Sequence, residues 1–251
     1  MIKYHPSDEW LQGHAAAELP LSLSIGIAAH CELCHECQTK LAEYTAQLAA
    51  LSFAGETDVP LSHRSSHGLK QHENSLAAQN HKRVLPVVNS DSDAETDVDM
   101  DAMLAKITAN GRQQVRLTPT PEVSVKGHNY RLPKVFAQLT EHSWQGLGKI
   151  SRMRLNAAED VPARASLMHI DVEGEIPEHT HKGQELTLLL AGEFEDEFNQ
   201  YVPGDFIVLN GEHLHSPKTK TGCLCYTIVD APLHFTKGLS KLLNPIGELI
   251  Y

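Results

Sequence analysis

The sequence predicts a multidomain α plus β protein, with helices in its N-terminal part and short antiparallel strands in its C-terminal part. Apolar residues recur at helical spacing up to about residue 52, and a long polar tract then precedes one more helical segment. After Arg112 the pattern changes to short apolar runs broken by Pro and Gly, which is typical of a β-sandwich or barrel. We therefore expect a small bundle of about four helices over 1–112 and an antiparallel β domain over 113–251.

The composition excludes several classes of function before any motif is considered. With 251 residues, the chain is long enough for one large domain or two of ordinary size. Its 21 Lys and Arg against 32 Asp and Glu make it acidic, and no Lys/Arg-rich run offers a phosphate-binding face, so we expect no direct binding of nucleic acid. No secretory signal pattern opens the chain and no run of about 18 apolar residues occurs, so we expect no membrane span and a cytoplasmic protein.

Three helices are expected before residue 52. Ser7 can cap the first, which extends toward Leu19. Pro20 suits the start of the second, which runs toward His30. The third carries apolar residues at spacings of three and four, which predict one buried stripe: Cys37, Leu41, Tyr44, Leu48 and Leu51.

A polar, Ser- and Asp-rich tract over 54–96 separates these helices from the fourth. Such a composition buries too little apolar surface to offset its ordering entropy, so we expect a mostly disordered insertion or linker. The fourth helix follows, since four apolar residues sit at i, i+3, i+4 and i+7 before Gly111: Met100, Met103, Leu104 and Ile107.

Four segments of the C-terminal part are expected to be strands. Turn signals at Gly174, Gly192, Pro203-Gly204 and Gly211 lie between them. The segments are Ala165–Val172, Glu185–Leu190, Asp205–Leu209 and Cys223–Val229.

The five cysteines form two groups, one around Cys34 and the other at Cys223 and Cys225. An odd number without a secretory signal argues against a disulfide framework and favours metal binding or thiol redox. Cys223 and Cys225 stand at i and i+2 of an expected strand, so both face one side. They are either small buried residues or oxidation targets.

The first group belongs to a pattern with metal-ligand spacing, His30-x3-Cys34-x2-Cys37. A helix end and the turn after it can direct these three side chains at one tetrahedral zinc ion. A fourth ligand is required. His5 precedes the first helix and can fold back to supply it, while Cys31 and His35 are local competitors.

A second pattern lies far downstream, where His179-x-His181-x3-Glu185 is followed by His215. Two histidines at i and i+2 of an extended segment project to one face, and a paired strand brings the glutamate onto it. The spacing of these residues and of the glycines around them closely resembles the two cupin motifs. The second motif is imperfect, since Asn210 and Glu212 replace a usual proline and glycine, and His213 is a rival to His215.

The first pattern, with its surrounding helices, resembles the zinc-containing anti-sigma domain. Joined to a cupin, it resembles the ChrR-like anti-sigma factors over nearly the whole chain except the polar tract. That resemblance implies two zinc ions per chain: His5, His30, Cys34 and Cys37 would hold one, and His179, His181, Glu185 and His215 the other.

The resemblance also implies a partner and a role without enzymatic activity. Family members sequester a group IV (extracytoplasmic-function, ECF) sigma factor, and their cupin responds to singlet oxygen or organic peroxide. The first and fourth helices carry much of that contact. Six apolar residues on them become candidates for partner binding, although each also suits an internal core: Trp10, Leu11, Met100, Met103, Leu104 and Ile107.

Two other interpretations of the second metal set stay open. A site of three histidines and a glutamate can activate oxygen or a substrate, so the chain could be a cupin dioxygenase or isomerase with a helical regulatory domain. No further set of polar residues suggests an acid/base pair or a clamp for a substrate carboxylate, and fold alone does not decide function. A purely structural zinc cupin used for oligomerisation is the remaining alternative.

Overall fold

The computed structural model describes residues 1–53, 100–109, 120–138, 143–155, 164–181, 183–231 and 233–235. The chain divides into two compact units, Met1–Asn80 with Thr120–Tyr251, and His81–Pro119. The second unit contains helix α4 (Met100–Ala109), which carries the four apolar residues of the expected fourth helix. The expected tract 54–96 and the expected domain boundary near residue 112 lie outside the described residues. No helix within the described ranges is long and apolar enough to cross a membrane.

The N-terminal helices begin where the sequence predicts. Helix α1 (Asp8–Ala15) is capped by the Ser7 hydroxyl, which accepts a hydrogen bond from the Trp10 amide at 3.3 Å. It ends before Leu19 because Ala17 adopts a left-handed conformation with φ 55°. Helix α2 (Leu21–Leu33) follows Pro20, and α3 (His35–Phe53) follows α2 after the single residue Cys34.

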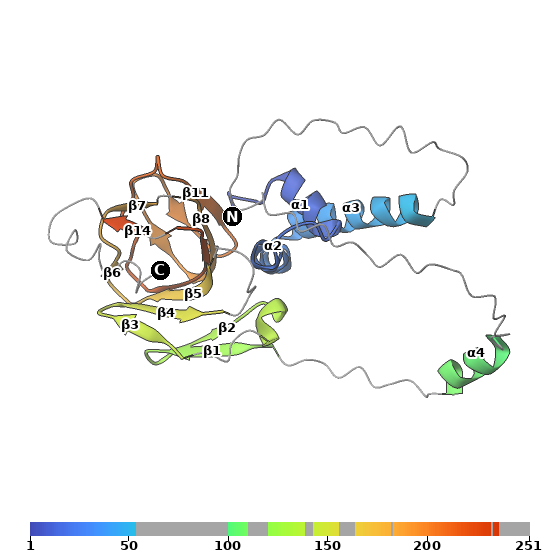
Figure 1. Cartoon of the computed structure of the whole chain (residues 1–251). Helices are drawn as coiled ribbons and strands as arrows, with labels where there is room; N and C mark the ends of the chain where they lie inside the picture. Colours follow the sequence, from blue (N-terminus) through green and yellow to red (C-terminus); the bar gives the residue numbers. More distant parts are fainter. Residues whose placement is uncertain are drawn as a thin grey trace. The chain divides into compact units, whose positions relative to one another are not determined.

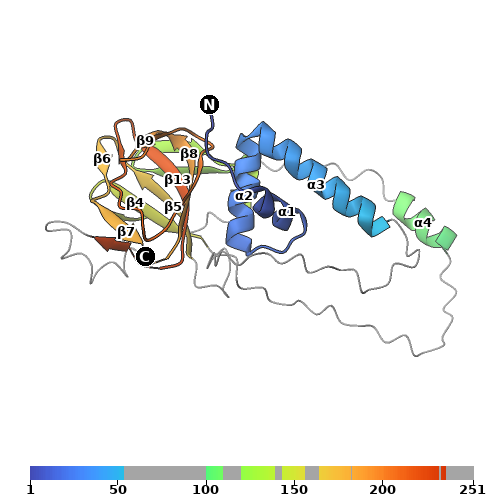
Figure 2. The same ribbon diagram turned by 90° about the horizontal axis from the view of Figure 1, so that it is seen from above.

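The apolar stripe of α3 is buried along only part of its length. Cys37 is buried, and Leu41 and Tyr44 pack against the core. Leu48 is 37 % exposed and Leu51 74 % exposed, because α3 extends beyond α1 and α2 at its C-terminal end (Figure 2). The helical periodicity therefore predicts the helix correctly but overstates how much of it packs within this chain.

The C-terminal part is antiparallel, as the sequence predicts (Figure 1). Six strands form the main sheet in the order β11-β8-β13-β5-β4-β3, a four-stranded sheet has the order β10-β9-β12-β6, and two pairs are β1-β2 and β14-β7. The bounds are β1 (Glu122–Val125), β2 (His128–Arg131), β3 (Gln145–Leu147), β4 (Ile150–Arg154), β5 (Arg164–Ile170), β6 (Gly174–Glu175), β7 (His179–His181), β8 (Glu185–Gly192), β9 (Phe194–Glu195), β10 (Gln200–Tyr201), β11 (Phe206–Leu209), β12 (Lys218–Thr219), β13 (Cys223–Val229) and β14 (Leu233–Phe235). A short 3-10 helix, η2 (Lys134–Gln138), follows β2.

Strands β8 and β13 are buried on both faces, which explains why their sequences do not alternate between apolar and polar residues. Leu188 of β8 lies in one core cluster with residues of α1 and α2, whereas its neighbour Leu189 lies in a second cluster with Phe194 and Cys225. All seven residues of β13 are buried. The main sheet thus separates a core shared with the helices from a core inside the β domain.

Helix α2 packs directly against the main sheet and shares its hydrophobic core. A Cβ on Gly26 would lie 3.2 Å from a ring carbon of Tyr226, so the glycine permits a close approach of helix to strand. The hydroxyl of Tyr226, which is fully buried, donates a hydrogen bond of 2.8 Å to the Ser22 carbonyl. Helix α2 is apolar around most of its circumference, and this pattern is typical of a helix that is buried on more than one side.

We predict that Tyr226→Phe destabilises the full chain by about 1 kcal/mol, because the change removes one buried hydrogen bond while keeping the ring that fills the core. Chemical denaturation followed by circular dichroism measures the loss. Tyr44→Phe is the matched control, since Tyr44 is a half-buried tyrosine of α3 for which the described residues show no hydroxyl hydrogen bond. Equal stability of wild type and Tyr226→Phe would contradict this account of the interface.

Candidate metal centres

Four side chains from three segments converge next to α2. His5 comes from the extended segment before α1, His30 from the last turn of α2, and Cys37 from the first turn of α3. Cys34, between the two helices, has extended backbone angles (φ −118°, ψ 106°), which turn the chain so that both thiols face the same point. One ligand atom from each of the four residues lies within 4.8 Å of the others.

The distances within this cluster suit a tetrahedral ion. The His5 Nδ1 atom is 3.5 Å from Cys34 Sγ and 3.4 Å from Cys37 Sγ. Ligand atoms around a tetrahedral zinc with normal bond lengths are separated by roughly 3.3–3.8 Å. Two thiols and two imidazoles are a donor set typical of structural zinc.

The environment of His30 supports the same interpretation. Its Nδ1 donates a hydrogen bond of 2.7 Å to the carbonyl of Gly204, and its Nε2 is buried with no hydrogen-bond partner among the described residues. Burial lowers the pKa of His30 to about 4, so the ring is neutral at pH 7 with a lone pair on Nε2. Metal-ligating histidines usually donate their other nitrogen to an acceptor of this kind, which fixes the tautomer.

The two local competitors for the fourth position lie outside the cluster. His35 is exposed on α3, beside Thr39. Cys31 is buried, and burial raises its pKa to about 11, with the nearby Cys34 adding to the effect. His5 therefore completes the group of four.

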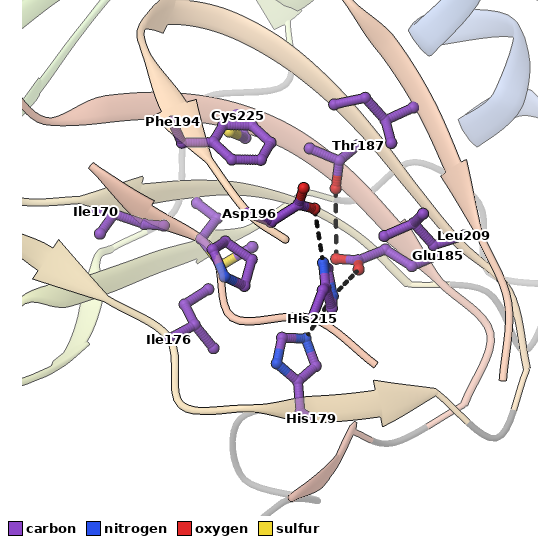
Figure 3. Close-up of a pocket in the computed structure, with 13 residues that line it drawn as sticks. Ile170, Ile176, His179, Glu185, Thr187, Phe194, Asp196, Leu209, His215 and Cys225 are labelled. Carbon is purple, nitrogen blue, oxygen red and sulfur yellow. Dashed lines mark hydrogen bonds and ion pairs between the residues drawn. The ribbon is translucent and has the colours of Figure 1, made fainter. Parts of the chain in front are cut away.

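The second cluster lies inside the β domain and joins strands that are distant in sequence. His179 begins β7, Glu185 begins β8, and His215 forms an isolated bridge with His179. One ligand atom of each lies within 4.8 Å of the other two, and all three residues are buried. Figure 3 shows His215 between Glu185 and His179.

The hydrogen bonds of the two histidines leave their Nε2 atoms facing each other. The Nδ1 of His179 donates to the Pro177 carbonyl at 3.0 Å, and the Nδ1 of His215 faces an oxygen of Asp196 at 3.4 Å. In neutral rings whose Nδ1–H groups face these acceptors, both Nε2 atoms would carry lone pairs, and these atoms are 3.0 Å apart. A cation next to both nitrogens relieves that repulsion, and the Glu185 carboxylate, 3.7 Å from His215 Nε2, adds a negative charge.

Asp196 is a site residue that motif spacing does not reveal. Its side chain is 1 % exposed. Burial alone would raise its pKa, but hydrogen bonds from His215 and from the amides of Phe198 and Asn199 outweigh that effect, so the pKa lies below the usual value and the group stays charged. The only sequence signal is its place in an acidic run after Gly192, which does not distinguish it from Glu195 or Glu197.

A small cavity of about 30 Å³ adjoins the second cluster. Its wall is mostly apolar, and it includes two sulfur-containing side chains, Met168 and Cys225. The side-chain hydrogen bond with Cys223, followed by burial, raises the pKa of the Cys225 thiol far above its usual value, so this thiol is protonated. Figure 3 shows Cys225 and Phe194 on the side of the cavity away from His179.

The remaining expected site residues lie in different surroundings. The backbone of His181 belongs to β7, but its side chain is outside the described part of the chain. His213, the rival of His215, forms a hydrogen bond with the Asn210 side chain and does not belong to the second cluster. Trp10 and Leu11 are buried in the core shared with the sheet, whereas Met103 and Leu104 are exposed on α4. The side chains of Met100 and Ile107 are not described.

Two comparisons relate the sequence to the protein ChrR. Residues 133–231 match the family model of the ChrR cupin-like domain. The anti-sigma-E factor ChrR of Cereibacter sphaeroides is 28 % identical over 251 residues, which are 99 % of this chain and 99 % of that protein. The chain is similar to ChrR over nearly its whole length.

Two solved structures illustrate the likeness. The structure of Rhodobacter sphaeroides SigE in complex with the anti-sigma ChrR matches 92 % of this chain and 100 % of the other, at 23 % identity and a TM-score of 0.57. It confirms the predicted fold class, helices followed by an antiparallel cupin. A putative acetylacetone dioxygenase from Methylibium petroleiphilum matches 40 % of this chain and 78 % of its own, at 13 % identity and a TM-score of 0.36.

We predict that Asp196→Asn lowers the metal affinity of the second cluster by about 10–100-fold, because the neutral amide no longer orients His215 or balances the charge of an ion. Competition with a chelator, followed by metal analysis of the full chain, measures the change. Glu193→Gln, an exposed carboxylate near the same loop, is the control. An Asp196→Asn chain with wild-type affinity at this cluster would remove Asp196 from the site.

Proposed function

We propose that this protein is an anti-sigma factor, in which the helical part holds a group IV (ECF) sigma factor and the cupin releases it under oxidative stress. The likeness to the anti-sigma-E factor ChrR, which spans 99 % of both chains, supports the proposal. We propose that each cluster binds one zinc ion, with His181 as a further ligand in the cupin. Zinc at the first cluster would hold α2, α3 and the N-terminal segment together.

The observation that carries the proposal is that one cupin turn supports two ligands of the first cluster. The carbonyl of Gly204 accepts the bond from His30. The buried carboxylate of Asp205 accepts bonds from the amides of Lys3 at 2.6 Å and Tyr4 at 3.1 Å. The Phe206 amide donates to the Tyr4 carbonyl at 3.0 Å. These bonds position the segment that carries His5, so a shift of this turn displaces both histidines.

The same turn is also connected to the cupin site. The amide of Gly204 donates to the Leu189 carbonyl at 2.8 Å, and the Leu189 amide donates to the Asp205 carbonyl at 3.1 Å. Leu189 belongs to β8, the strand that begins with Glu185. Ile207, just after the turn in β11, lines the cupin cavity. A chemical change at the cupin site therefore has a short route of backbone hydrogen bonds to the first cluster.

The size of the cavity bears on the enzyme alternative. Its volume of about 30 Å³ admits one or two water-sized molecules, by the usual measure of what a buried water needs. Among the described residues it has no room for an organic substrate, whereas a diatomic oxidant fits. Imidazole, thioether and thiol groups around it are oxidisable. We therefore favour a sensor of a small oxidant such as singlet oxygen over a dioxygenase or isomerase.

The sigma factor is proposed to contact α1 and α4. On α4, Met103 is 42 % and Leu104 51 % exposed, so both are available to a partner, and we keep Met100 and Ile107 in the proposal on their helical spacing. Trp10 packs edge-on against Phe206 of the cupin with ring centroids 6.0 Å apart. Trp10 and Leu11 can therefore reach a partner only when α1 moves away from β11.

We predict a division of labour between the two clusters. Cys34→Ala should release the sigma factor without any oxidant, because the loss of structural zinc loosens the helices that hold it. His179→Ala should keep basal inhibition and lose release by a photosensitiser. Transcription reconstituted with each group IV sigma factor of the organism measures both. The proposal fails if the wild-type chain inhibits none of them, and the division fails if His179→Ala abolishes inhibition.

We also predict that Gly204→Ala weakens zinc binding at the first cluster. A Cβ at this position, where φ is 98°, would lie 2.4 Å from the Ile2 side chain and would displace the carbonyl that orients His30. We expect at least a tenfold loss of zinc affinity in the chelator assay. Gly222→Ala is the matched control, since Gly222 has φ 88° but its nearest neighbour would lie at 3.4 Å. Equal losses in both variants would mean that backbone strain alone is responsible.

A further inference from the structure

A third cluster of metal-binding side chains lies outside both sites described above. His128 begins β2 of the β1-β2 hairpin, and His169 and Asp171 come from the end of β5 and the residue after it. One ligand atom of each lies within 4.8 Å of the other two. His128 also precedes the segment 133–231 that matches the ChrR cupin-like domain, so the cluster draws on sequence beyond that match.

The surroundings of His169 indicate that this residue binds a ligand. Its side chain is 0 % exposed, and neither of its ring nitrogens has a hydrogen-bond partner among the described residues. A buried polar atom without a partner destabilises the fold, so native structures rarely leave both nitrogens of a histidine in that state. The rings of His128 and Tyr130 are tilted against that of His169, with centroids 5.6 and 5.8 Å away, and these ring contacts give its nitrogens no hydrogen bond.

The other two members close the cluster from the surface side. The His128 Nε2 atom is 3.7 Å from Asp171 Oδ1, and their side chains are 40 % and 31 % exposed. Two imidazoles and one carboxylate arranged around one point leave coordination positions open to solvent. This donor set is typical of divalent transition cations rather than of calcium or magnesium, which prefer oxygen ligands alone.

We propose that His128, His169 and Asp171 form a third metal site, which binds a divalent transition cation such as zinc and connects the β1-β2 hairpin to β5. The ion gives His169 a partner for one buried nitrogen. The site is separate from the cupin cavity, since Met168 and Ile170, the neighbours of His169 in β5, line that cavity from the opposite face of the strand.

Lys126 is the one nearby feature of the hairpin that opposes a cation. Its ammonium group is 3.8 Å from Asp171 Oδ2 and donates a hydrogen bond to the Gly148 carbonyl. A salt bridge between Lys126 and Asp171 could by itself connect the hairpin to β5, but it would leave His169 unsatisfied. The lysine therefore serves as a test, because removing its charge should favour the ion and should not help a site that binds none.

The experiment uses the full chain, first loaded with zinc and desalted, and then titrated with further zinc while the histidine ring nitrogens are observed by ¹⁵N NMR. We expect the His169 and His128 signals to shift together in the wild type. In His128→Ala the zinc affinity of the proposed third site should fall at least tenfold, since a direct ligand is lost. His128 is partly exposed, so this variant spares the core. Asn129→Ala, on the next residue of β2, is the matched control and should bind as the wild type does.

Lys126→Met is the last variant of the test. It should raise the zinc affinity of the proposed third site several-fold, because a positive charge next to the ligands is removed. The proposal is overturned if the His169 signals stay unmoved in both the wild type and Lys126→Met. It is also overturned if His128→Ala binds zinc at this step as tightly as Asn129→Ala.

Discussion

The hydrogen bond from His30 to the Gly204 carbonyl is the interaction on which the relation between helices and sheet depends. It joins His30, a member of the first cluster, to the cupin at a fully buried point. Asp205 and Phe206 extend it by holding the backbone before His5. Because a carbonyl can only accept, the bond also selects the tautomer with the proton on Nδ1, which leaves a lone pair on His30 Nε2. The geometry of the first cluster therefore depends on the position of the cupin turn at Gly204, and neither can change alone.

The main sheet connects this turn to both hydrophobic cores of the protein. Since β8 and β13 are buried on both faces, each contributes side chains to the core under the helices and to the core around the cupin cavity. Leu188 faces the helices while its neighbour Leu189 faces the interior. Glu185 enters the interior from the start of the same strand. A strand with two apolar faces cannot rotate without disturbing both cores, so movement is expected to run along the strand and its turns.

The sequence predicts the elements that carry the motif residues, because short-range spacing reflects local geometry. The cap at Ser7, the start of α2, and the strands that carry Glu185 and the paired cysteines depend on neighbours in the chain. The sequence does not predict Asp196 or the cluster around His169, because these residues meet through strand register and loop closure. It also does not predict that Trp10 packs on Phe206, since periodicity shows that a face is apolar but not what covers it.

The outer face of the main sheet has a consequence for how far the molecule can open. Leu186, Leu188, Tyr226 and Ile228 form its apolar surface, and α2 covers them. A cupin parted from its helices would expose this surface to water and would tend to self-associate. Complete separation of the two parts is therefore unfavourable as a route for the proposed release of a sigma factor. A small displacement at the Gly204 turn would keep the sheet covered and would avoid an aggregation-prone intermediate.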